Sequence, residues 1–568
     1  MPPQPSRRLA DVTMRAAFTA GARPSVSSGG KNKPAAGKGN DAANDAPVAT
    51  RLNWHVLGGN NQKRIGANCG LCVYDETLPD GTTRQRALLF DAGVLAGDPR
   101  AAEDPALVDC DNIIPDLTPY LYKKDDPSHK PEVAIDSIYL THSHADHLGA
   151  LPFMIMMGYQ LPRIYATPYT VKRLQQELTT AGIAPADWPP IYMIAPGKPI
   201  EEGPAKVTAF WVSHSTPQSV GFFIETPEGN ILNPGDFKLD QTVLWGPAFS
   251  QAQLERIIGD KKVDLLLMDS TGADRDVTPI TEEDVRQTLR EVMAEHPNKR
   301  IVIAVMSGFE ENLASIGRVA AENSRDLWVA GWSHEQSLDA LAQTGMTLQD
   351  RIGLPLNVRV LAPGKAARDL ADAKPKQSVV VVTGAQGTQH AALTRAVDGT
   401  HNALTLDPKK DIVLFCAPSI PGQEAGRFRL LAQLRQKGIK FLTRQEKNLY
   451  AHAHARLPEL REMAKMIKPV TLVPIHGDAR LREACAQAMR EQGHRVLAAQ
   501  NGDLLRVSRK AGMTVASAHP QGQRLIGFKT LQGSSWQDKH YMMVRTSDRK
   551  NAANDAAPKR PRIFDIGK

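Results

Sequence analysis

The run His142-Ser143-His144-Ala145-Asp146-His147 constrains this chain most, because it places three histidines and one aspartate within six positions. It follows the apolar residues of 137–140 and precedes an apolar, glycine-containing stretch, so it occupies a turn between a strand and a helix. Imidazole and carboxylate groups are unfavourable to bury without partners. A surface loop would tolerate them without consequence, whereas a metal ion would require them. The turn must therefore be exposed or belong to a polar site.

The spacing within this turn favours a metal site. His142 and His144, two positions apart, can face one ion, and Asp146 and His147, further round the turn, can face a second ion close by. Imidazole nitrogen together with carboxylate oxygen suits Zn²⁺ or Mn²⁺. Two such ions about 3.5–4 Å apart can clamp both oxygens of an in-line phosphoryl displacement and generate hydroxide at neutral pH.

A two-ion site needs further ligands, one of which should bridge, and three candidates stand at strand ends. His214 ends the strand pattern KVTAFWVSH, Asp236 lies in NPGDFK after Gly235, and His476 lies in PIHGD before another glycine. A single histidine at a strand end is more often structural. Three candidates in matching strand–turn settings, together with the cluster at 142–147, predict a metal centre.

The pattern of apolar segments predicts an α/β protein of more than one domain, since 568 residues exceed one ordinary domain. Strands are expected at 87–93, 137–142, 162–167, 206–214, 220–236 and 264–271, and helices at 169–182 and 281–296. From about 272 to 445, near-continuous apolar strands alternate with helices, which is typical of a parallel sheet covered on both faces. Further elements are expected at 470–507, and past 509 only a few short strands.

The cysteines and the length of the apolar runs indicate in which cellular compartment the protein is expected. Five scattered cysteines argue against a disulfide framework and favour a reducing, cytoplasmic location. The lone Cys69-Gly70-Leu71-Cys72 is weak evidence for zinc or redox chemistry, and two small apolar residues near a strand are the expected explanation. No run of 18 or more apolar residues occurs, so no membrane-spanning helix is predicted.

The positive charge lies at the two ends. Residues 1–50 carry +4 and residues 509–568 carry +8 of a total of +8, which leaves the middle at −4. Residues 1–50 are rich in small and polar residues and are expected to be a disordered basic tail. Basic ends can collect polyanions such as nucleic acid, and they can also serve only to keep a disordered tail soluble.

The motifs resemble the β-CASP nucleases of the metallo-β-lactamase superfamily, and within them ribonuclease J. HSTPQSVGFFIETPEGNILNPGDFKLD, MDSTGADR, VVVTGAQG, APSIPGQE and PVTLVPIHGDARL are similar to ribonuclease J segments and stand in the family's order. The resemblance covers roughly residues 51–507. It implies a four-layer αββα metallo-β-lactamase fold with an inserted α/β β-CASP domain.

The resemblance also explains the spacing of the candidate ligands. His147 to His214 is 67 residues and His214 to Asp236 is 22, but Asp236 to His476 is 240. An inserted β-CASP domain at 272–445 would fill that gap, cap the metal site and form a cleft for a single nucleic-acid strand. The metallo-β-lactamase domain would then comprise 51–271 and 446–507, followed by a short basic extension at 508–568.

Residue roles follow from matching the family's motifs position by position. The resemblance implies one metal on His142, His144 and His214, a second on Asp146, His147 and His476, and a bridging, catalytic Asp236. Asp91 in LLFDAG would form hydrogen bonds to the metal ligands without binding a metal itself. Asp269 matches the first β-CASP motif. His454 matches the histidine placed near the scissile phosphate and is the second expected catalytic residue.

The chain departs from the family where substrate phosphates are normally held. The family's His-Val-Ser-Gly-His run reads Tyr450-Ala451-His452-Ala453-His454, and its Ser-Asn-Ile-His segment reads Glu311-Asn312-Leu313-Ala314. Glu311 is expected to add negative charge there. These changes predict weak discrimination between 5′-monophosphate and 5′-triphosphate RNA, with an endonucleolytic share. The residues expected to bind substrate are Asn312, Gly387, Ser419 and His452.

Three functions are weighed. A two-metal ribonuclease acting on single-stranded RNA is favoured, with two divalent ions, Zn²⁺ before Mn²⁺ or Mg²⁺. A DNA nuclease or another hydrolase on the same fold is the alternative, since nothing in the sequence separates RNA from DNA chemically. A non-catalytic RNA-binding relative would not need seven ionisable ligands. The C-terminal part, of about 60 residues, is shorter than the family's dimerising domain, and a homodimer or homotetramer stays open.

Overall fold

A computed structural model describes residues 51–96, 110–131, 133–420, 423–507, 514–516, 525–532, 540–545 and 562–565. The predicted basic tail at 1–50 and much of the predicted extension at 508–568 lie outside these residues.

The first sheet has eight strands and joins strands near residue 52 to strands near residue 505. It is ordered β10-β9-β7-β3-β2-β1-β23-β24. Strand β1 pairs antiparallel with both β2 and β23, so residues near 505 close the sheet that residues near 52 begin. The strands are β1 (Leu52–Gly58), β2 (Cys69–Thr77), β3 (Thr83–Phe90), β7 (Ser137–Tyr139), β9 (Arg163–Ala166), β10 (Ile191–Met193), β23 (Leu504–Val507) and β24 (Thr514–Ala516).

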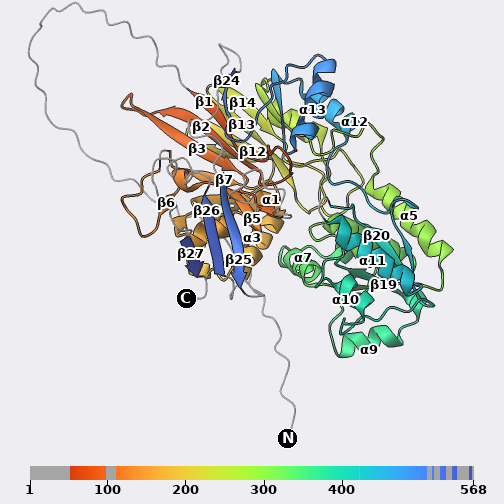
Figure 1. Cartoon of the computed structure of the whole chain (residues 1–568). Helices are drawn as coiled ribbons and strands as arrows, with labels where there is room; N and C mark the ends of the chain where they lie inside the picture. Colours follow the sequence, from red (N-terminus) through yellow and green to blue (C-terminus); the bar gives the residue numbers. More distant parts are fainter. Residues whose placement is uncertain are drawn as a thin grey trace, which may run out of the picture. The chain divides into compact units, whose positions relative to one another are not determined.

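A second, six-stranded sheet packs against the first. Its order is β11-β12-β13-β14-β15-β22, and its strands are β11 (Pro199–Glu202), β12 (Ala205–Trp211), β13 (Val220–Thr226), β14 (Gly229–Asn233), β15 (Leu265–Asp269) and β22 (Thr471–Ile475). One buried cluster joins the two sheets and includes Trp54, Tyr74, Phe222 and Leu267. Figure 1 shows β1–β3 beside β12–β14.

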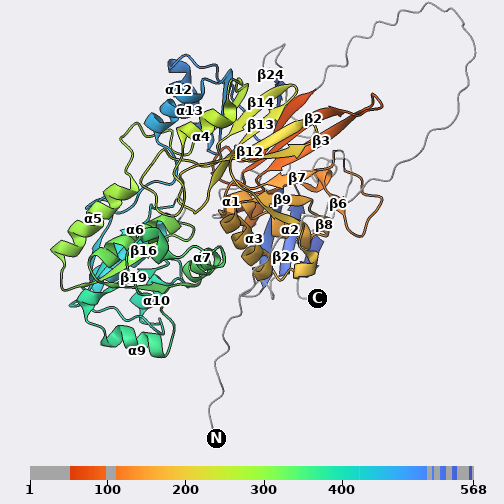
Figure 2. The same cartoon turned by 180° about the vertical axis from the view of Figure 1, so that it is seen from behind.

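Helices cover the outer face of each sheet. The first sheet packs on α2 (Leu151–Met156) and α3 (Pro168–Thr180), and the second packs on α4 (Gln251–Ile258), α12 (Leu457–Ile467) and α13 (Ala479–Glu491). Figure 2 shows α4, α12 and α13 together on one side and α2 and α3 on the other. The order helix, sheet, sheet, helix confirms the predicted four-layer αββα fold.

A third sheet, between β15 and β22 in the chain, is entirely parallel. Its order is β18-β17-β19-β16-β20-β21, and its strands are β16 (Arg300–Val305), β17 (Asp326–Ala330), β18 (Val358–Val360), β19 (Ser378–Val382), β20 (Asp411–Cys416) and β21 (Lys440–Leu442). All six lie inside the range 272–445, where the sequence predicts a parallel sheet covered on both faces.

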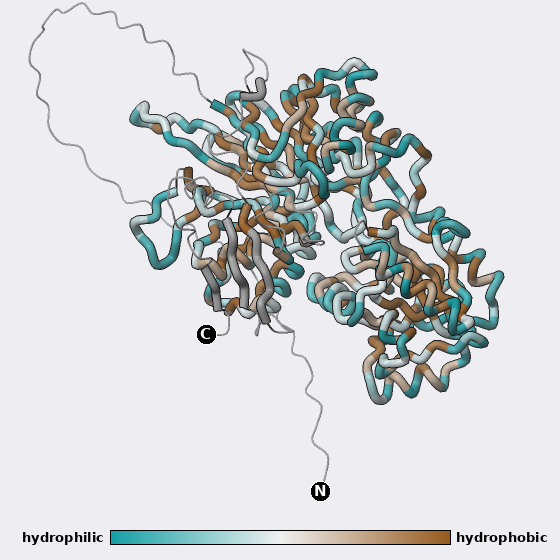
Figure 3. Tube along the Cα trace, in the orientation of Figure 1, coloured by the Kyte–Doolittle hydropathy of each residue, from teal (hydrophilic) through white to brown (hydrophobic). Residues whose placement is uncertain are grey.

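Helices bury both faces of this parallel sheet, as its apolar strands require. One face packs on α5 (Glu282–Glu295), α6 (Glu310–Glu322), α7 (Trp332–Gln343) and α8 (Leu348–Ile352). The other packs on α9 (Lys365–Asp372), α10 (Ala392–Asp398) and α11 (Glu424–Gln436). Helix α5 begins with a capping box between Thr281 and Asp284, the start predicted from the sequence. Figure 3 shows hydrophobic segments concentrated along these strands.

The C-terminal strands join the first half of the chain. Strand β25 (Leu525–Gln532) pairs with β5 (Asn112–Pro115) in a five-stranded sheet with β4 (Leu95–Ala96), β26 (His540–Arg545) and β27 (Arg562–Asp565). Ile526 is fully buried in the core beneath α2 and α3. A two-stranded sheet of β6 (Tyr122–Lys123) and β8 (Tyr159–Gln160) completes the strands of the described residues.

The cysteines behave as small apolar residues. All five are buried. Cys69 and Cys72 belong to separate hydrophobic clusters on opposite sides of β2. Burial raises the pKa of the Cys72 thiol to about 12, so the CxxC pair is not poised for redox chemistry.

Within the described ranges, no helix has the length and apolarity needed to cross a membrane.

Candidate metal centre

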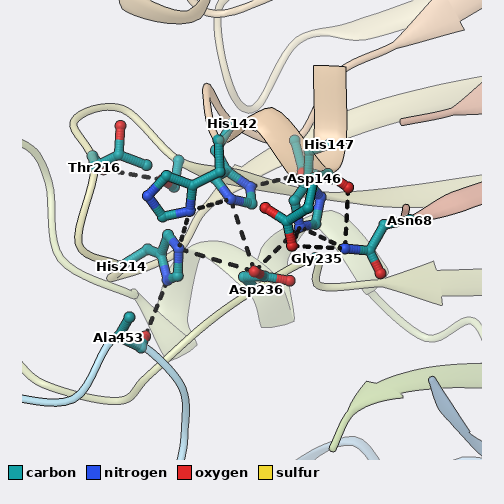
Figure 4. A network of polar contacts seen from close by, with 12 residues as sticks. Asn68, His142, Asp146, His147, His214, Thr216, Gly235, Asp236 and Ala453 are labelled. Atoms are coloured by element: carbon teal, nitrogen blue, oxygen red, sulfur yellow. Dashed lines mark hydrogen bonds and ion pairs between the residues drawn. The ribbon is translucent and has the colours of Figure 1, made fainter. Parts of the chain in front are cut away.

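The seven predicted ligands converge from five segments. His142 and His144 follow β7, Asp146 and His147 lie in the short helix α1 (Ala145–Leu148), and the other three follow strand ends. Figure 4 shows the side chains of His142, His147 and His214 turned toward the carboxylate of Asp236. All are buried or half-buried, so the turn at 142–147 is part of a polar site rather than an exposed loop.

The first set of donors is formed by three imidazoles. His144 Nδ1 lies 3.0 Å from His142 Nε2 and 3.2 Å from His214 Nε2. Asp236 Oδ2 is 3.7 Å from His142 Nε2 and 3.9 Å from His214 Nε2. Four donors held about 2.0–2.1 Å from a tetrahedral Zn²⁺ would lie roughly 3.3 Å apart. The observed spacing therefore fits one ion.

The second set meets the same carboxylate oxygen. Asp236 Oδ2 lies 3.2 Å from His147 Nε2 and 3.0 Å from His476 Nε2. Asp146 Oδ2 lies 3.7 Å from the first of these nitrogens and 3.5 Å from the second. One oxygen of Asp236 thus faces donors from both sets, which is the position that a bridging ligand needs.

Backbone carbonyls decide which ring nitrogens of the first set are free. His144 Nε2 donates to the carbonyl of Gly308 at 2.9 Å, and His214 Nδ1 donates to the carbonyl of Ala453 at 2.9 Å. In each neutral ring the other nitrogen then carries a bare lone pair. These two lone pairs face each other across 3.2 Å, an arrangement that a cation between them would stabilise. The donor chemistry therefore fits a divalent metal.

Asp91 orients a histidine of the second set in the same way, by accepting a hydrogen bond from its outer ring nitrogen. Its Oδ2 accepts from His147 Nδ1 at 2.8 Å, and its Oδ1 accepts from the backbone N–H of Thr141. The Thr141 hydroxyl in turn contacts His142 Nδ1 at 2.9 Å. Asp91 has a φ of 58° and His476 a φ of 52°, a region that residues other than glycine rarely adopt. Such strained positions concentrate at functional sites.

The two sets differ in their charge. Burial opposes the charge of His147, but Asp236, Asp91 and Asp146 outweigh it and raise its pKa to about 10. Burial and the neighbouring imidazoles together hold the pKa of His142 well below its ordinary value. A proton and a metal ion compete for the same lone pair. The first set is therefore ready to bind a cation, whereas the second must release protons when it does.

His454 stands beside both sets without belonging to either predicted one. Its Nδ1 lies 2.9 Å from Asp269 Oδ2 and 3.7 Å from Asp236 Oδ2. Its ring centroid is 5.4 Å from that of His214 and 5.3 Å from that of His476. Asp269 thus fixes the orientation of the His454 ring through Nδ1. The same position also allows a metal-binding group of His454 with Asp236 and His476.

Sequence reasoning missed Asn68. Its side-chain Nδ2 lies 2.9 Å from His147 Nε2 and donates to Asp146 Oδ2 at 3.2 Å, as Figure 4 shows. The preceding Ala67 has a positive φ of 57°. A small residue forced into that conformation directly before an asparagine gives little signal in the sequence itself.

The four residues expected to bind substrate lie in different settings. Ser419 is exposed in the loop after β20, and His452 is half-buried two residues before His454. Gly387 has a φ of 72°, and a Cβ there would meet the backbone of Gly426 at 2.2 Å, so its glycine has a packing reason. Asn312 is buried and lies 3.4 Å from the Cys416 carbonyl. Gln386, next to Gly387, contacts Pro418 and Ile420 on either side of Ser419, whereas Asn312 is buried.

The expectation that Glu311 faces a substrate phosphate is wrong. Glu311 is only 3% exposed, and its carboxylate accepts from the backbone N–H groups of Leu244 and Trp245. Burial, followed by the charge of Glu282, raises its pKa to about 8. The carboxyl group therefore belongs to the junction between the segment after β14 and helix α6.

Three family models match consecutive parts of the chain. The Beta-lactamase superfamily domain matches residues 107–302, the Ribonuclease J beta-CASP domain matches 298–434, and the Zn-dependent metallo-hydrolase RNA specificity domain matches 439–499. The chain is a ribonuclease J-like β-CASP member of the metallo-β-lactamase superfamily. The β-CASP match lies within the parallel sheet and its helices.

Similar proteins carry the same family name. Ribonuclease J 1 of Streptococcus pyogenes is 28% identical over 74% of this chain and 70% of the relative. Ribonuclease J of Sinorhizobium meliloti is 28% identical over 82% of this chain and 76% of the relative. A crystal structure of a protein of unknown function from Enterococcus faecalis V583 covers 80% of this ribonuclease J-like chain with a TM-score of 0.57 and 15% identity. That likeness shows the fold alone.

Proposed function

We propose that this protein is a metal-dependent ribonuclease that hydrolyses phosphodiester bonds of single-stranded RNA in RNA processing or decay. The observation that carries the proposal is the single carboxylate oxygen, Asp236 Oδ2, that lies within 3.9 Å of imidazole nitrogens from both donor sets. The family membership and the name ribonuclease J of its relatives support RNA as the substrate.

In this proposal each donor set holds one divalent ion. His142, His144 and His214 would hold the first ion and Asp146, His147 and His476 the second, with Asp236 available to both. Five imidazoles and two carboxylates favour Zn²⁺, and Mn²⁺ is the next candidate. When bound, the two ions supply a hydroxide nucleophile at neutral pH and neutralise the charge that develops on the phosphate oxygens.

The protein's own residues orient that chemistry. Asp91 and the carbonyls of Gly308 and Ala453 hold the ligand rings so that their free nitrogens point inward. His454, oriented by Asp269 at 2.9 Å, steadies the scissile phosphate or donates a proton to the leaving oxygen. Because Asp269 accepts from Nδ1, the proton that His454 offers to the substrate is on Nε2.

The inserted domain supplies the substrate side of the site. Gly308, in the loop after β16, contacts His144, and the loops after β19 and β20 leave the same carboxyl edge of the parallel sheet. Open parallel sheets bind ligands outside this edge. We place Gly387, Ser419 and His452 in the RNA path, whereas the burial of Asn312 favours an indirect role.

Assembly and location belong to the same proposal. We propose a homodimer or homotetramer, by analogy with the family, and a cytoplasmic location, where RNA and a reducing environment suit five buried cysteines. Size-exclusion chromatography with light scattering would measure the oligomer directly.

One assay tests the function. Purified full-length protein is incubated with one labelled oligonucleotide in 5′-monophosphate RNA, 5′-triphosphate RNA and DNA versions, each with Zn²⁺, Mn²⁺ or Mg²⁺ and after chelation. We expect cleavage of RNA that needs a divalent ion. Equal or preferred cleavage of DNA would replace the ribonuclease proposal by a DNA nuclease, and an absence of hydrolysis with every ion would refute both.

A further inference from the structure

Trp332 is a large apolar side chain that the fold leaves in contact with solvent. It is 58% exposed and occupies the first position of helix α7, directly after strand β17. A single exposed apolar residue needs no explanation by itself. The place of this one in the fold and its chemistry give it one. The other tryptophans of the described residues are buried or half-buried, namely Trp54, Trp188, Trp211, Trp245 and Trp328.

Trp332 lies close to the metal centre. The hydroxyl of the next residue, Ser333, is 2.7 Å from the hydroxyl of Ser307. Ser307 precedes Gly308, whose carbonyl accepts from the candidate ligand His144 at 2.9 Å. With successive Cα atoms about 3.8 Å apart, these contacts hold the Cα of Trp332 within roughly 15 Å of that of Gly308. A strand bound at the metal centre can therefore reach Trp332 within a few nucleotides.

The start of helix α7 is held firmly in this place. Gly331 has a φ of 126°, and a Cβ on it would meet the side chain of Thr383 at 2.6 Å, so the turn into α7 is packed closely on the loop after β19. On the other side, Gln176 of α3 donates to the carbonyl of Gln336 in α7 at 3.0 Å. Figure 2 shows α7 beside α3. The tryptophan is thus presented by a rigid element that contacts both domains.

The charge of this helix indicates which part of a nucleotide Trp332 would contact. Helix α7 contains Glu335 and Asp339 but no lysine or arginine. Such a surface offers nothing to neutralise a phosphate, whereas the flat face of an indole ring suits the face of a nucleobase. The chemistry at the start of α7 therefore fits a base rather than the sugar–phosphate backbone.

We propose that Trp332 stacks on one base of the RNA strand, a few nucleotides from the phosphodiester held at the metal centre. An aromatic side chain can stack on any base, and sequence preference then follows stacking strength. The contact would align the strand with the metal centre without reading its sequence, and it would favour purines at that position. The inference rests on the proposed function, because it takes RNA as the ligand.

The test is RNA binding by the full-length protein after chelation, so that no turnover is needed. Short oligo(A), short oligo(U) and a sugar–phosphate oligomer of the same length without bases are titrated against wild type and Trp332→Ala. We expect the variant to bind oligo(A) about 5- to 150-fold more weakly, the range for losing one stacked base. The loss should be smaller for oligo(U) and below about twofold for the oligomer without bases.

A conservative variant separates stacking from other roles of the side chain. Trp332→Phe keeps an aromatic face and should bind oligo(A) within about threefold of wild type. It also assigns the optical signal, because oligo(A) should quench the tryptophan fluorescence of wild type more than that of Trp332→Phe.

The matched control is Tyr122→Ala, which removes another exposed aromatic side chain. Tyr122 is 53% exposed on β6, and Figures 1 and 2 both show β6 on the side of the first sheet away from α7. This variant should bind all three oligomers within about twofold of wild type. Thermal melting and light scattering check the fold and the oligomeric state of each variant.

Wild-type affinity of Trp332→Ala for oligo(A) would overturn the proposal, and so would an equal loss for the oligomer without bases. A changed oligomeric state with unchanged RNA binding would assign Trp332 to an interface between copies instead. If Trp332→Ala does not fold, quenching in Trp332→Phe equal to that of wild type overturns the proposal. A failed ribonuclease proposal is distinguishable, because wild-type protein would then bind the oligomers in the same order without cleaving RNA when metal is restored.

Discussion

Replacing Asp236 by asparagine should weaken both metal sites at once. The substitution keeps the size of the side chain and removes the negative charge from the oxygen that lies 3.0 Å from His476 Nε2 and 3.7 Å from His142 Nε2. The first donor set would then hold three neutral imidazoles and no anion, whereas the second would still have Asp146. The two sets are therefore affected unequally.

The expected loss of metal affinity can be estimated from the effect of removing a group that supports a ligand. Groups that only support a ligand change metal affinity by about 10- to 100-fold, so a shared ligand should change it by at least about 100-fold at each set. Asp236→Asn should bind less than one ion per chain at micromolar free metal and cleave RNA at least about 100-fold more slowly. Asp146→Asn, the matched variant, touches only the second set and should keep one ion.

Metal content by elemental analysis after equilibration with a metal buffer, calorimetric titration and initial cleavage rates are measured on the same preparations. Thermal melting of the metal-free variants checks that each is folded. A folded Asp236→Asn protein with two bound ions and the wild-type rate would refute the shared role. An Asp146→Asn protein that loses both ions would show that Asp146 carries it instead.

His454→Ala should keep both ions and slow cleavage by about 10²- to 10⁴-fold, as for a positioned acid–base group, and elemental analysis showing a missing ion would make His454 a ligand. Asp91→Asn should lower metal affinity about 10- to 100-fold without changing the number of ions at saturation, because His147 is no longer held in its orientation; unchanged affinity in a competition titration would count against it. Since burial and Glu282 raise the pKa of Glu311 from 4.5 to about 8, the wild-type free energy of unfolding should fall as pH rises between these values. Glu311→Gln should flatten that fall, and denaturant titrations at three pH values that give parallel slopes would contradict it.

The sequence alone determined the elements and the chemical class of the site. Periodicity of apolar residues is local information, so the strands ending at His142, His214, Asp236 and His476 were predictable one by one. The continuous apolar runs of 300–416 predicted a parallel sheet buried on both faces, because such strands have no polar side to expose. The resemblance to the family added the order in which the domains join, with one domain inserted in the other, and the roles expected for the matching residues.

Only the tertiary structure decided how the site is held. Gly308 and His144 are 164 residues apart, and Ala453 and His214 are 239 apart, yet these contacts set which ring nitrogens are free. Glu311 reads as an exposed charge in a helix until the fold buries it against Leu244 and Trp245.

The same holds for the C-terminal strand β25, whose partner β5 lies about 410 residues earlier in the chain. The expected weakness of 5′-monophosphate recognition stays a prediction. Local patterns report a residue's own burial, but a hydrogen-bond partner, a shared ligand or a missing counter-charge is a property of two or more distant segments, and it exists only once the chain has folded.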